Sequence, residues 1–256
     1  VLDPIWSTKT ETASRVRGRM ELILDWAKAR GYRTGENPAR WRGHLDAVYP
    51  KRSRLRKVQH LEAVPIEDLP AVYGRLCSVP GIAALAARFT ILTAVRVGVT
   101  VGAKETELGA GLWSVSAERM KAGRDHNVPL SDEAKAVLDL ARKFRTDPAD
   151  DRLFPGRHAG RGVKQSVVLK SFRAAGAGTA TLHGCRSTFR DWTAERTAFP
   201  SEVAEMALAH AVANPVEAAY RRGDLLKKRT TMMQAWAGYL TTPVSAKVVA
   251  INRLSA

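Results

Sequence analysis

Four residues in the last third of the chain have side chains suited to covalent chemistry on a phosphodiester. His183 and Arg186 stand three positions apart, His210 follows, and Tyr220 comes ten residues after it. A tyrosine phenol has an ordinary pKa of about 10, so it is a poor nucleophile near neutral pH unless it is activated. Arginine side chains can bind non-bridging phosphate oxygens, on which negative charge develops during attack. The four residues therefore predict a tyrosine nucleophile acting on phosphorus.

Two further cations lie upstream of these four. Arg96 follows an apolar helix predicted over residues 81–95, and an arginine that closes a buried helix must be paired or face an anion. Lys121 lies in the turn between two predicted strands. Taken singly, Arg96 is also compatible with a structural ion pair, His210 with a core histidine and Tyr220 with a packing residue. The six residues in this order favour a catalytic site.

The charge of the chain indicates a polyanionic partner. The 256 residues include 41 Lys and Arg against 25 Asp and Glu, a formal net charge of +16. Nucleic acid explains this excess better than an anionic membrane does, because no basic amphipathic anchor stands apart in the sequence. A hydrophobic content of 45% excludes a disordered tail and supports a core.

The cysteines and the chain ends bear on location. Cys77 and Cys185 are far apart and lack metal-ligand spacing, so we expect a reducing, cytoplasmic setting at the bacterial nucleoid, without a disulfide framework. No membrane span or signal peptide is visible. Because the chain begins with Val1 rather than methionine, we also expect a fragment of a longer protein.

Periodicity and turn residues predict a mainly α fold with a small antiparallel β-sheet, an α+β class. The first helix is expected to open with a capping box at Thr8 and Glu11 and to run to about Arg30, closed by Gly31. Two strands are expected at 111–115 and 127–130, and Ser131 is expected to cap the helix after them. The other expected helices cover residues 37–48, 65–78, 81–95, 165–174, 183 onward, 200–210 and 224–239.

Basic residues outside the predicted site are candidates for contact with the DNA backbone. Five lie in a segment without acidic residues, which reads as a linker over 51–60 between a helical part at 1–50 and a larger domain at 61–256. A solvated charge run and a solvated helix flank are the alternatives. The candidates are Arg15, Arg19, Lys51, Arg52, Arg54, Arg56, Lys57, Arg124, Arg190 and Arg221.

The ordered set resembles the tyrosine recombinases, specifically the phage-type integrases. The resemblance runs over nearly the whole chain and rests on the segments LTAVRVG, AERMKAGRDHNVPLS, HGCRSTFRDW, EVAEMALAH and VEAAYRRGD. It implies an integrase-like catalytic domain preceded by part of a helical core-binding domain, together forming a clamp on DNA. It also implies a homotetramer on paired attachment-type sites of double-stranded DNA, a Holliday junction and an accessory DNA-bending protein.

The resemblance also assigns roles. It implies that Tyr220 forms a 3′-phosphotyrosyl bond, that Lys121 protonates the leaving 5′-oxygen and that His183 assists proton transfer from the phenol. Arg96 and Arg186 would bind the phosphate, with His210 hydrogen-bonded to it. No metal or cofactor is needed, because the phosphotyrosine bond stores the energy of the broken phosphodiester. The sequence has no paired carboxylates, CxxC pairs or P-loop.

Val99 departs from the pattern of the family. Family members usually carry an acidic residue three positions after the first arginine, where it is thought to orient that arginine. Two alternatives to a recombinase follow: a catalytically impaired, DNA-binding remnant of a prophage integrase, and a nicking-closing enzyme like the type IB topoisomerases. Because only part of a core-binding domain is expected here, we predict weak site binding and poor recombination by this chain alone.

Overall fold

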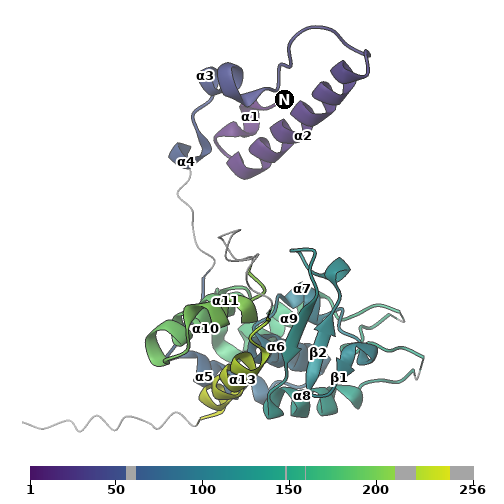
Figure 1. Cartoon of the computed structure of the whole chain (residues 1–256), viewed down its shortest axis with the longest axis vertical. Helices are drawn as coiled ribbons and strands as arrows, with labels where there is room; N and C mark the ends of the chain where they lie inside the picture. The colour runs from purple at the N-terminus through teal and green to yellow at the C-terminus, as the bar shows by residue number, and fades with distance from the viewer. Residues whose placement is uncertain (56–61, 148, 159, 211–222, 243–256) are drawn as a thin grey trace, which may run out of the picture. The chain divides into compact units, whose positions relative to one another are not determined.

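The chain forms two compact units, Val1–His60 and Leu61–Ala256. The computed structural model describes residues 1–55, 62–147, 149–158, 160–210 and 223–242 (Figure 1). The described part is mostly helical with one three-stranded antiparallel sheet, which confirms the predicted fold class. None of its helices combines the length and the apolar character that crossing a membrane requires.

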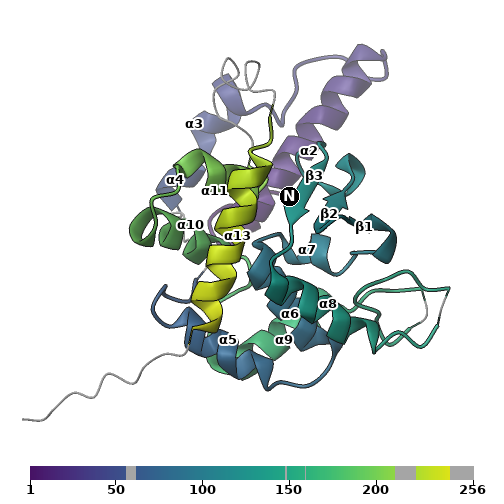
Figure 2. The same cartoon turned by 60° about the horizontal axis from the view of Figure 1, so that its bottom comes forward.

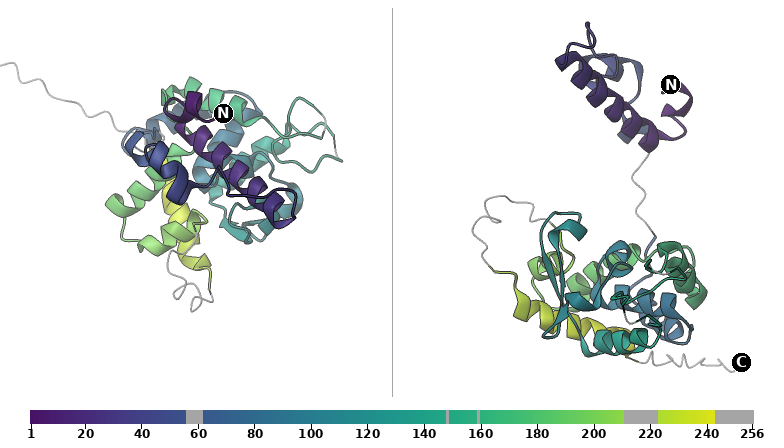
Figure 3. Two further views of the ribbon diagram at one scale, coloured as in Figure 1. Left: turned by 90° about the horizontal axis from the view of Figure 1, so that it is seen from above. Right: turned by 90° about the vertical axis from the view of Figure 1, so that its right-hand side faces the viewer.

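The first unit is built around one long helix, α2 (Thr10–Ala29), drawn in purple in Figure 3. Its small core contains Leu2, Trp6 and Ala13, and the Trp6 ring stacks on Trp41 at a centroid distance of 5.3 Å. The remaining helical segments are α1 (Asp3–Trp6), η1 (Trp41–Leu45), α3 (Asp46–Val48) and α4 (Arg52–Leu55).

Two local expectations for this unit were wrong. The capping box is absent, because the chain already turns in α1 and the Thr8 hydroxyl donates to the carbonyl of Pro4 (3.2 Å) instead of capping α2. The helix predicted over 37–48 is broken, because Gly43 has a φ of 73°. The closure of this helix by Gly31 is confirmed: α2 ends at Ala29, Arg30 is its C-cap, and Gly31 has the left-handed φ (75°) that many helix ends require.

The second unit is organised around the apolar helix α6 (Ile82–Thr93), which packs against α5, α8, α9 and α13 (Figures 1 and 2). The ten buried residues of this twelve-residue helix explain why its sequence is apolar on most sides. The other helical elements are α5 (Leu69–Cys77), α7 (Val97–Thr100), η2 (Glu105–Glu107), η3 (Ala117–Arg119), α8 (Asp132–Arg142), α9 (Gln165–Phe172), η4 (Arg173–Ala177), α10 (Gly184–Arg196), α11 (Ser201–Ala207) and α13 (Leu226–Thr241).

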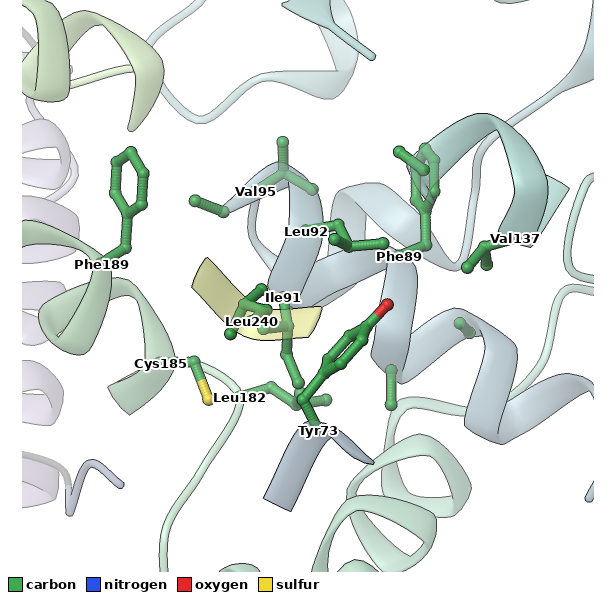
Figure 4. Packing of buried hydrophobic residues seen from close by; sticks show 14 of the residues in the cluster. Tyr73, Phe89, Ile91, Leu92, Val95, Val137, Leu182, Cys185, Phe189 and Leu240 are labelled. Atoms are coloured by element: carbon green, nitrogen blue, oxygen red, sulfur yellow. The ribbon is translucent and has the colours of Figure 1, made fainter. Parts of the chain in front are cut away.

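The core extends on both sides of α6. Figure 4 shows Phe89, Ile91 and Leu92 of α6 between Val137 of α8 and Phe189 of α10. The C-terminal helix α13 is tied to the same core, because Trp236 donates its indole N–H to the Ile91 carbonyl (2.9 Å). The elements that carry the predicted site residues are therefore attached to one packed body.

The sheet has the order β1-β2-β3, with β1 at Leu108–Gly109, β2 at Leu112–Val115 and β3 at His126–Pro129. The predicted hairpin is confirmed as β2 and β3, with Val115 opposite His126. The strand β1 was not predicted, since two residues give no detectable alternation. Ser131 caps α8 as expected, its Oγ accepting from the Ala134 N–H (3.2 Å).

Candidate active site

Arg96 lies between two helices that change direction at this point. The helix α6 ends at Ala94, which adopts a left-handed φ of 53°, and Arg96 is the N-cap residue of α7. Its backbone carbonyl accepts the first hydrogen bond of α7, from the Val99 N–H (2.8 Å). The side chain is half-buried, and the described part of the chain supplies it with no hydrogen bond or ion pair. A guanidinium in this state is available to an anion.

Arg186 is buried on α10, with 5% of its surface exposed. Its guanidinium donates to the Ala94 carbonyl and to the Leu208 carbonyl (2.7 Å). Burial, and secondarily the neighbouring charge of Arg96, lowers the pKa of Arg186 to about 10. The side chain therefore stays cationic at neutral pH while it holds the ends of α6 and α11 together.

His210 follows α11 and is oriented from both sides of its ring. Its Nδ1 lies 2.6 Å from a carboxylate oxygen of Glu205, and its Nε2 lies 3.2 Å from Nη2 of Arg186. Since a carboxylate accepts and a guanidinium donates, these contacts place the proton of the neutral ring on Nδ1. The backbone N–H of His210 also donates to the Glu205 carbonyl (3.0 Å).

Glu205 joins His210 to Arg190. The Arg190 Nε donates to the second carboxylate oxygen at 2.6 Å. Burial opposes ionisation of Glu205, but the hydrogen bonds from Arg190 and His210 outweigh it and lower the pKa of this carboxyl. Sequence reasoning missed this role. The signal was a glutamate five residues before the histidine, close enough for both a backbone and a side-chain contact.

His183 occupies the N-terminus of α10, next to Arg186. The turn before it is fixed by the Thr181 hydroxyl, which accepts from the Gly184 N–H (3.0 Å). Gly184 is required by a close approach, because an added Cβ would lie 2.2 Å from the Glu62 carbonyl oxygen. Burial lowers the pKa of His183, and positive charge nearby lowers it further.

The charges acting on His183 show which residues the fold brings together. In decreasing order of effect they are Arg186, Arg96, His210 and Lys121. Lys121 itself lies exposed in the turn between η3 and β3. Five of the six predicted catalytic residues therefore gather within electrostatic reach of one imidazole, although they are spread over more than a hundred residues of sequence. The sixth, Tyr220, lies outside the described residues.

The family model described as "Phage integrase family" matches residues 79–225, more than half of the chain. The chain belongs to the phage integrase family. This confirms the predicted membership of the tyrosine recombinases of the phage-integrase type, and the matched range contains all six predicted catalytic positions. A second family model, "Phage integrase central domain", matches residues 1–44.

Curated relatives agree with this assignment. The chain is 35% identical to prophage integrase IntA of Escherichia coli K12 over 147 residues, which are 57% of this chain and 35% of the relative. It is 30% identical to prophage integrase IntZ of the same organism over 241 residues, 90% of this chain and 56% of the relative. This integrase-family chain thus spans about one third to just over half of the length of these two relatives.

Solved structures show the same fold. A lambda integrase (75–356) dimer bound to a COC′ core site superposes with a TM-score of 0.60 at 18% identity, covering 82% of this chain and 76% of that one. A lambda integrase tetramer bound to a Holliday junction gives 0.59 at 19% identity, covering 84% of this chain and 63% of that one. These likenesses establish the fold of this integrase-family chain.

A cavity of about 380 Å³ lies beside the site. Its walls include His210, His126 of β3 and Arg229 of α13. His126 is 8% exposed, and burial, then the charge of Arg229, lowers its pKa to about 4. This histidine is therefore neutral at pH 7 and lines the cavity together with His210. Sequence reasoning did not single it out.

Arg229 anchors the start of α13 to the sheet. It is 2% exposed, and its guanidinium donates to the Asp224 carbonyl (2.8 Å), to the Asp224 carboxylate (2.9 Å) and to the Asn127 carbonyl of β3 (2.7 Å). Asp224 stands four residues after Tyr220 in the sequence. His210 and Asp224, which stand before and after Tyr220 in the sequence, are therefore both held in place by hydrogen bonds. Sequence reasoning missed Arg229 as well.

The predicted DNA-contacting residues remain predictions. Arg15 is exposed and ion-paired with Glu11 (2.8 Å), whereas Arg190 is held by Glu205. Among the others, Arg19, Lys51, Arg54 and Arg124 are exposed. Arg56, Lys57 and Arg221 lie outside the described residues, and the side chain of Arg52 is not described either.

The buried cysteine has a packing role. Cys185 lies between His183 and Arg186 but is turned into the core beside Leu182 (Figure 4). Burial raises the pKa of its thiol to about 12, so it stays protonated at neutral pH. Both Cys77 and Cys185 are free.

Proposed function

We propose that this chain is the strand-cleaving and rejoining part of a site-specific DNA recombinase. The single observation that carries the proposal is the gathering of Arg96, Lys121, Arg186 and His210 around His183. Such a concentration of positive charge and hydrogen-bonding groups suits a phosphodiester, whose charge increases as an oxygen attacks. The net charge of +16 supports double-stranded DNA as the substrate.

In the proposed reaction, the Tyr220 oxygen attacks phosphorus, forming a 3′-phosphotyrosyl bond while the bond from phosphorus to the 5′-oxygen breaks. His183 accepts the phenol proton, a role that its lowered pKa supports because its ring is neutral at pH 7. Lys121 donates a proton to the departing 5′-oxygen. Attack of a 5′-hydroxyl on the phosphotyrosine then reverses these steps and rejoins the strand.

Arg96 and Arg186 bind the two non-bridging oxygens in this proposal. Removing one such donor is expected to raise the barrier by about 3 to 4 kcal/mol. His210 is proposed to hydrogen-bond the phosphate while Glu205 keeps hold of its Nδ1. None of these steps routes a charge or proton through a metal or cofactor.

For the domains, we propose residues 61–256 as the catalytic domain, 1–50 as part of a core-binding domain and 51–60 as a basic linker. Support comes from the division into compact units at His60 and from the two family models, which match separate parts of the chain. A homotetramer on paired sites is proposed by analogy with the lambda integrase tetramer on a Holliday junction. The accessory DNA-bending protein stays a prediction.

An impaired DNA-binding remnant is the second candidate, favoured by Val99 and opposed by the five gathered residues.

One experiment distinguishes the recombinase from the DNA-binding remnant. The chain is incubated with a pool of randomised duplexes, each carrying a nick that lets the cleaved end diffuse away, and covalent complexes are recovered on a denaturing gel. We expect an adduct from the native chain and none from Tyr220→Phe. Salt-sensitive binding without any adduct would identify a remnant.

A further inference from the structure

The backbone around Arg96 is held at two carbonyls, one on each side. Two residues before it, the Ala94 carbonyl accepts from Arg186. Three residues after it, the Val99 carbonyl accepts from Nη2 of Arg119 (2.7 Å). Since the Arg96 side chain has no partner of its own among the described residues, its direction depends on how firmly this short stretch of backbone is fixed.

Arg119 is itself held rigidly. Its Nη1 forms an ion pair with Glu107, and the side chains of the two residues are only 24% and 14% exposed. The second oxygen of Glu107 accepts from the buried indole of Trp113 (2.8 Å) and from the Lys104 N–H (3.1 Å). A carboxylate with this many donors is fixed in place, and the planar fork of the arginine transmits that position.

The guanidinium of Arg119 packs closely against the backbone at Gly102. A Cβ added to Gly102 would lie 3.0 Å from Nη2 of Arg119, so a side chain there would crowd the group that reaches Val99. The Thr90 hydroxyl of α6, which donates to the Ala86 carbonyl (2.7 Å), is hydrogen-bonded to the Thr100 hydroxyl (3.0 Å), and both threonines are buried. The turn after Arg96 is thus attached to the core through Thr100 and to the sheet region through Val99.

Residue 99 receives this support through its backbone. The aliphatic Val99 side chain is buried and can donate or accept no hydrogen bond, so it cannot orient Arg96 directly. The carbonyl of the same residue does have a charged partner. We propose that Glu107 and Arg119 are positioning residues for the cleavage reaction: by holding the Val99 carbonyl, they fix the turn that aims Arg96 at the scissile phosphate.

This inference rests on the proposed function. It predicts that weakening the Glu107–Arg119 ion pair slows cleavage of the charged phosphodiester and does not weaken DNA binding. Glu107→Gln keeps an acceptor for Trp113 but removes the charge that holds Arg119. Arg119→Lys keeps a cation but cannot reach Glu107 and Val99 together with a planar fork.

Glu105→Gln is a matched control. Glu105 belongs to the same short turn, η2, but its ion pairs are with Arg142 of α8 (2.6 Å) and with Arg145 (3.9 Å). The substitution is the same as Glu107→Gln, two positions away. Arg96→Gln serves as the reference for loss of the arginine itself, and thermal unfolding of every variant reports whether it is folded.

The test uses a nicked duplex selected for adduct formation by the native chain, in two forms. One carries the ordinary phosphodiester and the other a neutral methylphosphonate at the cleaved position. A neutral linkage lacks the charge that Arg96 would balance, so misdirecting Arg96 should matter less on it. On the phosphodiester we expect Glu107→Gln and Arg119→Lys to slow adduct formation by about ten- to a hundredfold. On the methylphosphonate we expect rates close to native.

Two results would overturn the inference. In the first, both variants form adduct on the phosphodiester as fast as Glu105→Gln. In the second, both variants are slowed equally on the two linkages while Arg96→Gln is slowed only on the phosphodiester. If the native chain forms no adduct with any DNA of the pool, the proposed function fails and the inference fails with it. Glu105→Gln is expected to behave as native on both substrates.

Discussion

Arg186 and His210 meet at 3.2 Å, Nη2 to Nε2, and each is held by partners on its other side. Arg186 reaches the carbonyls of Ala94 and Leu208, and His210 reaches Glu205. The two residues therefore do not depend on DNA to find each other. A site in this state is preorganised, which is where most of the electrostatic stabilisation of a charged transition state originates.

Glu205→Ala is expected to slow adduct formation by about ten- to a hundredfold, since His210 loses the partner that fixes its ring. Binding to the same duplex, measured by gel shift, should change little because Glu205 carries no positive charge. Glu195→Ala is the control, removing an exposed glutamate from α10. Equal rates for the Glu205 and Glu195 variants would show that Glu205 has no part in positioning.

Substitution of the two arginines should affect the stability of the protein differently. Arg96→Gln and Arg186→Gln are both expected to lower the cleavage rate by about a hundred- to a thousandfold. Only Arg186→Gln should lower the free energy of unfolding, by about 3 kcal/mol, because it leaves buried carbonyls without their donor. Urea unfolding measures this, and a similar loss for Arg96→Gln would contradict the structure.

The contrast between these arginines also shows what sequence can reveal. Residue order alone predicted both as catalytic, because the six residues occur in a recognisable succession. It could not show that Arg186 holds two helix ends, since Ala94 and Leu208 are 92 and 22 residues away from it. Helices with a strong apolar pattern, such as α6, were predictable for the same reason that they are buried.

Contacts formed only in the folded chain were not predictable. Glu205, Arg119 and Arg229 are ordinary charged residues in the sequence, and their roles depend on backbone carbonyls or side chains brought near by folding. The failed capping box at Thr8 has the same origin. Its hydroxyl has a nearer acceptor at Pro4, in a helix too short to detect from periodicity.

Arg229→Met should destabilise the protein by about 3 kcal/mol, because the substitution leaves carbonyls at Asp224 and Asn127 without a donor. Asp224→Asn removes only the half-exposed carboxylate charge and keeps the backbone acceptor, so its effect should be below about 1 kcal/mol. Urea unfolding of the two variants tests the difference. Equal losses would mean that the ion pair, and not the burial of Arg229, dominates.

His126 should make the protein less stable in mild acid. Unfolded histidine binds a proton below a pKa of about 6.5, whereas His126 in the folded protein does so only near pH 4. The unfolded state therefore binds more protons between these values, and stability falls as the pH falls through this window, by about 3 kcal/mol in total.

Urea unfolding at several pH values from 7 to 4 measures this effect. The His126→Gln variant should lose the larger part of the pH dependence, because glutamine does not titrate. Some dependence should remain from His183, whose pKa is lowered in the same direction. An unchanged pH profile in the variant would show that His126 titrates normally in the folded chain.

The most direct test of the central claim is to map the bond between protein and DNA. The adduct from a nicked duplex is digested with a protease, and the DNA-linked peptide is sequenced by mass spectrometry. We expect the linked residue to be Tyr220, joined to a 3′-phosphate, with a free 5′-hydroxyl on the other side of the break. A different linked residue, or a linkage to a 5′-phosphate, would contradict the assignment of the site.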